Sequence, residues 1–268
     1  MLKIVATFTL VVMGVTLPLV ESQKAIANPP QVAQLSSTII ISQAENLIRQ
    51  AWDKYEQGDY QGAIATYTEA LRLEPNNADI YFLRGVVRSR AGNYQQAVQD
   101  LDQSIRLNPS NASAYFIRGL VHFGLDDKQK AVEDFNEVIS LDSNHSDAYS
   151  FRGRARYFLD DNQGAMEDFN QAIRLNPEDA KSYILRGGLR GRLEDYQGAI
   201  EDLSQGIRLD PENANADVYF LRGLMYGFLD EETKAMADLQ QGARLYQQAG
   251  DTEGYEKAQQ AIQELKKR

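Results

Sequence analysis

Arginine and aspartate recur at a fixed spacing along most of the 268-residue chain. These charged side chains are the ones whose spacing could form ion pairs or bind a charged ligand. Five arginines stand in the pattern Tyr-x-x-Arg-Gly, and an aspartate follows each of them after sixteen residues. Guanidinium groups in register can bind a row of carboxylates or phosphates. Alternatively, each arginine pairs with its own aspartate. The pairs are Arg84 and Asp100, Arg118 and Asp134, Arg152 and Asp168, Arg186 and Asp202, and Arg222 and Asp238.

The first unit of the pattern favours structural pairing over ligand binding. It has Gln50 at the arginine position and Thr66 at the aspartate position, so both charges are absent together. We therefore expect an ion pair inside each unit, whose loss costs about 3–5 kcal/mol when it is buried. A second row of arginines lies where a helix is expected to end, and we interpret it as a solvated row that complements the helix dipole. This row contains Arg72, Arg106, Arg174, Arg208 and Arg244.

The residue composition offers no catalytic or metal-binding set. The absence of cysteine excludes disulfides, thiolate metal sites and a cysteine nucleophile. The two histidines, His122 and His145, stand out of register, and no catalytic motif accompanies them. A net charge of −10 argues against binding nucleic acid through its phosphates. The sequence therefore predicts a protein that is not an enzyme and has no cofactor, metal or nucleic-acid site.

The N-terminus has the features of a secretory signal. Residues 1–27 combine Lys3, an apolar stretch and the small-residue site Ala25-Ile26-Ala27, so we expect cleavage after Ala27. The alternative is an uncleaved membrane anchor, although an apolar stretch interrupted by Pro18 is short for that purpose. Residues 28–43 are interpreted as a flexible spacer.

The remaining chain repeats with a period of 34 residues. Prolines at 75, 109, 177 and 211 follow this period, and Ser143 takes the place of a proline in the same register. Two extra residues before the last unit lengthen one turn. Within a unit, a turn signal separates two amphipathic segments, predicted in the second unit as helices over 78–91 and 94–107. The paired acids Asp126-Asp127, Asp160-Asp161 and Glu231-Glu232 stand at such turns, where we expect them to lie at helix N-termini.

This pattern resembles the tetratricopeptide repeat. The family's small positions are occupied here by residues such as Gly85, Gly119 and Ala97, and its large position by Tyr67, Leu101, Phe135, Phe169, Leu203 and Leu239. The resemblance implies an all-α, right-handed α-solenoid of six helix–turn–helix units closed by a capping helix. The expected units are 44–77, 78–111, 112–145, 146–179, 180–213 and 216–250, and the expected capping helix is 251–268.

The resemblance also implies a ligand groove on the concave face, lined by the first helix of each unit. Aromatic and arginine side chains there have the composition of an interface centre. About half of them are expected to pack between neighbouring helices instead. Gly188 and Gly191 suggest a pocket in the fifth unit. The candidate partner-binding residues are Trp52, Tyr55, Phe82, Arg90, Phe116, Leu120, Phe123, Arg154, Tyr157, Phe158, Arg192, Phe220, Leu224 and Phe228.

Two functions are compatible with such a groove. The first is an exported, non-enzymatic scaffold, such as an assembly factor, that binds a segment or helix of another protein. The second is a structural protein that self-assembles through the same groove. The phrases Arg-Leu-Asn-Pro and Asp-Tyr-Gln-Gly-Ala-Ile resemble cyanobacterial members of the family, which implies the periplasm or the thylakoid lumen and no membrane contact after signal cleavage. The lysine and asparagine clamp for acidic tails, known in the family, is absent.

Overall fold

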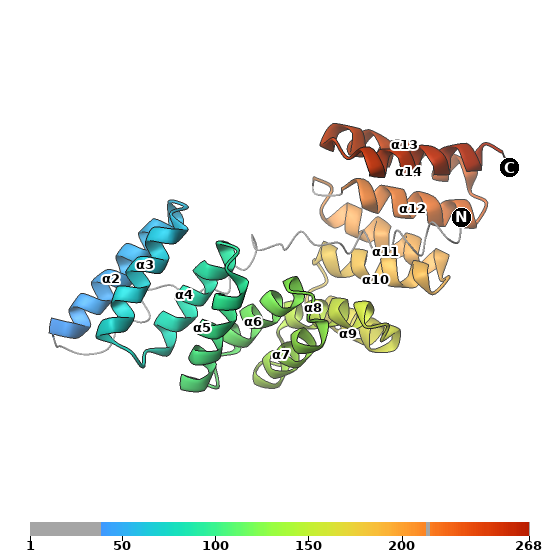
Figure 1. Cartoon of the computed structure of the whole chain (residues 1–268). Coiled ribbons are helices and arrows are strands. Elements are labelled where there is room, and N and C mark those ends of the chain that lie inside the picture. Colours follow the sequence, from blue (N-terminus) through green and yellow to red (C-terminus); the bar gives the residue numbers. More distant parts are fainter. Residues whose placement is uncertain (1–38, 213–214, 268) are drawn as a thin grey trace. The chain divides into compact units, whose positions relative to one another are not determined.

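The computed structural model describes residues 39–212 and 215–267, and this part of the chain is all α-helical (Figure 1). Helices α2 to α13 form helix–turn–helix pairs, and a final helix follows them, as the sequence predicts. The helices are α2 (Ile39–Glu56), α3 (Tyr60–Leu73), α4 (Ala78–Arg90), α5 (Tyr94–Leu107), α6 (Ala112–Gly124), α7 (Lys128–Leu141), α8 (Ser146–Phe158), α9 (Asn162–Leu175), α10 (Ala180–Arg192), α11 (Tyr196–Leu209), α12 (Ala216–Phe228), α13 (Glu232–Ala249) and α14 (Thr252–Leu265).

The described residues divide into two compact units. The N-terminal unit ends at Ala155, and the C-terminal unit begins at Arg156, inside α8. In the N-terminal unit α3 packs on α4 and α5 packs on α6, so that the second helix of each pair contacts the first helix of the next. In the C-terminal unit α11 packs on α12 in the same way, and α14 covers α13. The predicted capping helix is therefore present as α14.

Side-chain caps begin most of these helices. Asp127 and Asp161, each the second acid of a predicted turn pair, accept a hydrogen bond from the backbone N–H three residues later. Such a cap satisfies one of the N–H groups that the first helical turn leaves without a partner. The acid before each cap, such as Asp126 or Asp160, has a positive φ, a conformation that favours glycine. The paired acids therefore do lie at helix N-termini.

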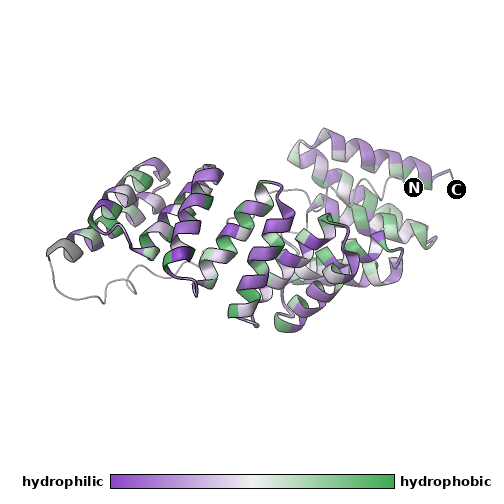
Figure 2. Ribbon diagram, turned by 60° about the horizontal axis from the view of Figure 1, so that its bottom comes forward, coloured by the Kyte–Doolittle hydropathy of each residue, from purple (hydrophilic) through white to green (hydrophobic). Residues whose placement is uncertain are grey.

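In four of the helix pairs the core forms where a large side chain meets a glycine, namely Gly85, Gly119, Gly187 or Gly223. The residues at the family's large position, from Tyr67 to Leu239, are fully buried. A Cβ added at Gly119 would lie 2.9 Å from Phe135 Cε1, and one added at Gly223 would lie 3.0 Å from Leu239 Cγ. The absence of a Cβ thus lets the two helices approach closely. Along most helices, hydrophilic and hydrophobic residues alternate between faces, as expected for amphipathic packing (Figure 2).

The structure corrects two predictions. The spacer predicted over 28–43 ends early, because α2 already begins at Ile39. The buried residues Ala44 and Ile48 lie one helical turn apart, and no proline or glycine interrupts the helix before them. The pocket suggested at Gly188 and Gly191 is also wrong, because both glycines are buried and Met225 Sδ would lie 2.8 Å from a Cβ on Gly191.

The predicted signal over 1–27 lies outside the described residues. Among the described helices, we find none that combines the length and the apolar character needed to span a bilayer.

Candidate functional site

Four of the five predicted arginine–aspartate pairs are present as bidentate contacts. In the fifth repeat, Arg186 Nε and Nη2 donate to the two carboxylate oxygens of Asp202 at 2.8 and 2.7 Å. The same geometry joins Arg84 to Asp100, Arg118 to Asp134, and Arg222 to Asp238. Each aspartate is buried, so the pair ties the two helices of a repeat together. Arg152 and Asp168 belong to different compact units, and their pairing stays a prediction.

Each of these arginines also makes a bond that sequence reasoning missed. The remaining Nη1 donates backwards to an oxygen on the second helix of the preceding repeat, as from Arg118 to Asp102 at 2.6 Å and from Arg186 to Asn170 at 2.7 Å. The guanidinium therefore links three helices. The sequence does contain a periodic pattern that could have predicted these bonds, because each acceptor position holds a residue with a side-chain oxygen. The acceptors are Thr68, Asp102, Asn136, Asn170 and Ser204.

The tyrosine of the Tyr-x-x-Arg-Gly pattern packs against the same guanidinium. The distance from the arginine Cζ to the ring centroid is 5.5 Å for Arg118 over Tyr115 and 5.6 Å for Arg186 over Tyr183. This contact holds the guanidinium plane in place and adds a cation–π attraction. The recurrent tyrosines are therefore positioning residues for the ion pairs. The second predicted arginine row is exposed, as expected, and Arg174, for example, donates to the nearby Gln171.

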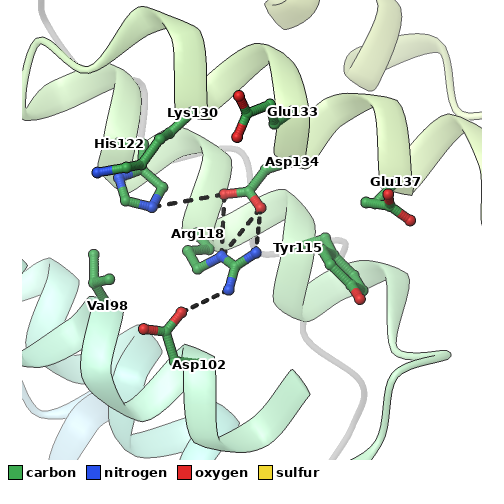
Figure 3. A pocket seen from close by; sticks show the side chains of 9 residues that line it. All are labelled: Val98, Asp102, Tyr115, Arg118, His122, Lys130, Glu133, Asp134 and Glu137. Carbon is green, nitrogen blue, oxygen red and sulfur yellow. Dashed lines mark hydrogen bonds and ion pairs between the residues drawn. The ribbon is translucent and has the colours of Figure 1, made fainter. Parts of the chain in front are cut away.

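A pocket of about 520 Å³ opens between the second and third repeats, at the Arg118–Asp134 pair (Figure 3). Its lining comes from α5, α6 and α7. Arg118 Nη1 contacts Asp102, and His122 Nε2 lies 3.9 Å from Asp134 Oδ2. Figure 3 shows these side chains together with Lys130 and Glu133, which project from the neighbouring α7. The sequence did not predict this pocket.

Burial shifts the pKa values of the titratable groups in this pocket. Burial lowers the pKa of His122, against the weaker opposing effect of the Asp134 carboxylate. Burial also raises the pKa of Asp134, although its hydrogen bond from Arg118 acts in the opposite direction. His122 is therefore neutral at neutral pH. For Asp134, the positive charge of Arg118 does not fully offset the cost of burying the carboxylate.

The structure separates the fourteen predicted partner-binding residues into two equal groups. Seven are buried, so they pack in the core and no partner can contact them in this conformation. Phe116, for example, packs on Phe135 and Phe151 with ring centroids 5.8 Å apart in each case. The first helices of the repeats lie close enough for these side chains to fill the space between them. The buried seven are Phe82, Phe116, Leu120, Phe123, Tyr157, Phe220 and Leu224.

The other seven predicted residues are half-buried and offer surface to a partner. In the N-terminal unit, the Trp52 and Tyr55 rings lie 5.2 Å apart, and the Arg154 guanidinium lies 4.9 Å from the Phe123 ring centroid. Burial lowers the pKa of Arg154 to about 10, so it remains charged at neutral pH. The half-buried seven are Trp52, Tyr55, Arg90, Arg154, Phe158, Arg192 and Phe228.

In the C-terminal unit the half-buried residues are held by ring contacts. Phe228 stacks on Tyr196 with a centroid distance of 4.6 Å and an interplanar angle of 15°. Phe158 packs edge-on against Tyr157, and the Arg192 guanidinium lies 4.7 Å from the centroid of that same tyrosine ring. These side chains are therefore fixed before any partner arrives. Their role in binding stays a prediction.

Comparison with known families decides the architecture. A profile of the TPR repeat matches residues 53–92, and a profile of the tetratricopeptide repeat matches residues 87–146 and 152–214. Together they cover more than half of the chain. The chain belongs to the tetratricopeptide repeat family. Tetratricopeptide repeat domains bind proteins, typically as interaction scaffolds, and are usually not catalytic. No curated protein sequence matches this tetratricopeptide repeat protein.

Solved structures share this tetratricopeptide repeat fold at low sequence identity. A structure of PilF from Pseudomonas aeruginosa is 17% identical, with a TM-score of 0.71, and covers 83% of this chain and 99% of its own. MamA from Desulfovibrio magneticus RS-1 is 22% identical, with a TM-score of 0.60, over 64% of this chain and 97% of its own. YrrB, described as a TPR protein with an unusual peptide-binding site, is 19% identical with a TM-score of 0.58, over 72% of this chain and 97% of its own. These likenesses establish the fold alone.

Proposed function

We propose that this protein is an exported, non-enzymatic scaffold that binds a segment of another protein on the first helices of its repeats. Membership of the tetratricopeptide repeat family supports binding of a protein. The observation that carries the proposal is the set of seven half-buried aromatic and arginine side chains on those helices. Tryptophan, tyrosine and arginine are the residues that most often dominate the binding energy of an interface.

The half-buried side chains are suited to act as anchors because their neighbours already hold them. Phe228 is stacked on Tyr196, and Trp52 Nε1 donates to Glu56 Oε1 at 3.0 Å. An anchor that is rigid before binding loses little conformational entropy when the partner arrives. An extended or helical partner segment with apolar side chains would bury the exposed part of these rings.

Affinity isolation from the native host tests the binding surface. We expect Trp52→Ala and Phe228→Ala each to lower recovery of the partner that wild-type protein retains, with an unchanged circular dichroism spectrum. Arg174→Ala is the matched control, because Arg174 is exposed at the end of a second helix. Equal recovery with all three variants would contradict the proposed surface. Recovery of a second copy of the chain would support the self-assembling structural protein instead.

Export is proposed from the N-terminal sequence. The residues 1–27 have the charge and the small-residue site of a secretory signal, and the destination proposed is the periplasm or the thylakoid lumen. Mass spectrometry of the protein purified from its host tests this directly. We expect a chain that begins at Asn28. A chain that retains residues 1–27 in the cytosol would refute export, and one that retains them in the membrane fraction would indicate an uncleaved anchor.

A further inference from the structure

One position in the first helix of a repeat faces the buried aspartate in the second, fourth and fifth repeats, whereas the third repeat has His122 there and the sixth has Tyr226. In the second, fourth and fifth repeats this position is an arginine whose Nη1 lies 2.7 to 2.9 Å from an aspartate Oδ2. The pairs are Arg88 with Asp100, Arg156 with Asp168, and Arg190 with Asp202. In the first repeat, Lys54 Nζ donates to Thr66 Oγ1 at 2.8 Å. The third repeat has His122, which leaves Asp134 Oδ2 without this second cation.

In the fourth and fifth repeats, the arginine at this position also contacts a backbone carbonyl. Nη1 donates to the carbonyl of Gly198 at 3.2 Å in the fifth repeat, and to that of Gly164 at 3.3 Å in the fourth. The corresponding carbonyl in the third repeat belongs to Lys130. A guanidinium in this place would therefore meet one carboxylate oxygen and one carbonyl oxygen. Because imidazole is much shorter than an arginine side chain, His122 leaves the place open.

The pocket beside His122 has the charge of a cation site. Four carboxylates line it against two permanent cations, Arg118 and Lys130. Arg118 donates its hydrogen bonds to Asp134 and Asp102, and Lys130 forms an ion pair with Asp127 at 2.8 Å. His122 is only 8% exposed, and its Nε2 lies 3.9 Å from Asp134 Oδ2, which is beyond hydrogen-bond distance. Excess negative charge thus surrounds a buried carboxylate that lacks the second cation present in the second, fourth and fifth repeats.

We propose that this pocket binds the guanidinium group of an arginine side chain on a partner protein. The bound group takes the place that Arg88, Arg156 and Arg190 fill in their own repeats, and donates to Asp134 Oδ2 and the Lys130 carbonyl. The site lies on α5, α6 and α7, apart from the half-buried aromatic residues of the proposed function. It is therefore a second contact, specific for one arginine.

The geometry favours guanidinium over other ligands. A guanidinium presents several donors in a plane and can satisfy a carboxylate and a carbonyl together, whereas an ammonium is a compact and strongly hydrated charge. An anion would meet four carboxylates. Among the residues that the structure describes, no group of three or more histidine, aspartate or glutamate side chains is placed to hold a metal ion.

Histidine resonances provide a direct test, because the chain has only two histidines. His122 lines the pocket, whereas His145 packs its ring 4.8 Å from that of Phe116 and acts as an internal control. The full chain, labelled with ¹³C-histidine, is titrated with Nα-acetyl-arginine-methylamide at neutral pH. We expect a saturable shift of the His122 resonance and none of the His145 resonance. The citrulline analogue, which has the same shape without the charge, should leave both unchanged.

Two substitutions locate the binding site. His122→Arg fills the pocket as Arg88, Arg156 and Arg190 do in their repeats, and it should abolish binding. Because this variant has no His122 resonance, its binding is followed by the backbone amide resonances of α7. Glu133→Gln removes one lining carboxylate and should weaken binding by about three- to tenfold, since it lowers the Coulombic attraction for the bound guanidinium without removing one of its hydrogen bonds. Glu201→Gln, at the same position of the fifth repeat, is the matched control and should leave binding unchanged.

Several outcomes would overturn the proposal. An equal response to the citrulline analogue would show that charge is not recognised, and an unchanged response of His122→Arg would place binding elsewhere. Tighter binding of free arginine than of the capped form would indicate a site for the amino acid rather than for a protein side chain. Equal shifts at His122 and His145 would indicate an unspecific effect of the probe.

Discussion

The replacement of Asp202 by alanine is predicted to destabilise the protein strongly. Asp202 is 3% exposed, accepts two hydrogen bonds from Arg186 and forms an ion pair with Arg190. Alanine leaves both guanidinium groups without their carboxylate. Removal of one partner from a buried ion pair costs about 3–5 kcal/mol. Because the two arginine side chains are 15% and 26% exposed, water can replace part of the lost contact, so we expect about 3 kcal/mol.

The loss is measured by urea unfolding and by thermal melting, both followed by circular dichroism. For a chain of this length, about 3 kcal/mol corresponds to a decrease in Tm of roughly 6–12 °C. Glu253→Gln is the control, because its ion pair with Lys257 lies on the surface of α14 and Glu253 is 80% exposed. Loss of such a pair should change the free energy of unfolding by less than about 1 kcal/mol.

A double-mutant cycle tests whether the ion pair is the cause. Arg186→Ala and Asp202→Ala should together cost less than the sum of the two single losses, with a coupling energy of at least about 1 kcal/mol. A loss for Asp202→Ala as small as that for Glu253→Gln would refute the reasoning. Additive losses in the cycle would show that the aspartate acts through something other than Arg186.

Three further predictions concern local features of the fold. The Tyr67 hydroxyl is buried and has no hydrogen-bond partner in the described part of the chain, so Tyr67→Phe should raise the free energy of unfolding by about 1 kcal/mol, read from the urea midpoint; a decrease would show that the hydroxyl has a partner. Glu194 has φ +64°, so Glu194→Gly should stabilise by roughly 1 kcal/mol in the same assay, and no gain would mean that this backbone carries no strain. The pKa of His122 is lowered, so the unfolded chain binds a proton more readily and stability should fall as the pH drops below about 6.5, by at most about 1.4 kcal/mol per pH unit. Urea titrations at several pH values should show a weaker dependence for His122→Gln, and identical profiles would contradict the assignment.

The period of the sequence predicted the helices and the ion pairs well. The helices predicted over 78–91 and 94–107 are observed over Ala78–Arg90 and Tyr94–Leu107. The paired loss of arginine and aspartate in the first unit predicted that the two side chains interact. Both inferences rest on contacts within one repeat, where the spacing along the chain fixes the spacing in space.

Contacts between repeats were harder to predict. Each arginine of the Tyr-x-x-Arg-Gly pattern donates a hydrogen bond to threonine, aspartate, asparagine or serine of the preceding repeat. These residue types differ, and the side-chain oxygen that they share is not evident from any single repeat of the sequence. The burial of Phe116 and Leu120 was also not readable residue by residue. A helix period places a side chain on a face, but the distance to the neighbouring helix decides whether that face is open.

The arginine pocket depends on one position of the repeat, which holds His122 in the third repeat and an arginine in the second, fourth and fifth. The sequence shows His122, but it does not show that the arginines at the same position of other repeats contact the buried aspartates. Only the structure shows that Arg88 and Arg190 fill a place that His122 leaves open. Comparison of the repeats with one another, position by position, is the signal that would have revealed it.

Site-specific photo-crosslinking tests the scaffold function most directly. A photoreactive amino acid is placed at Phe158, a half-buried residue of a first helix, and at the exposed Arg174 as a control, in protein produced in its native host. The account predicts a discrete crosslink to another protein from position 158, which Phe228→Ala diminishes, and none from position 174. Crosslinks of equal yield from both positions, or from neither, would contradict the claim that the first helices bind a partner.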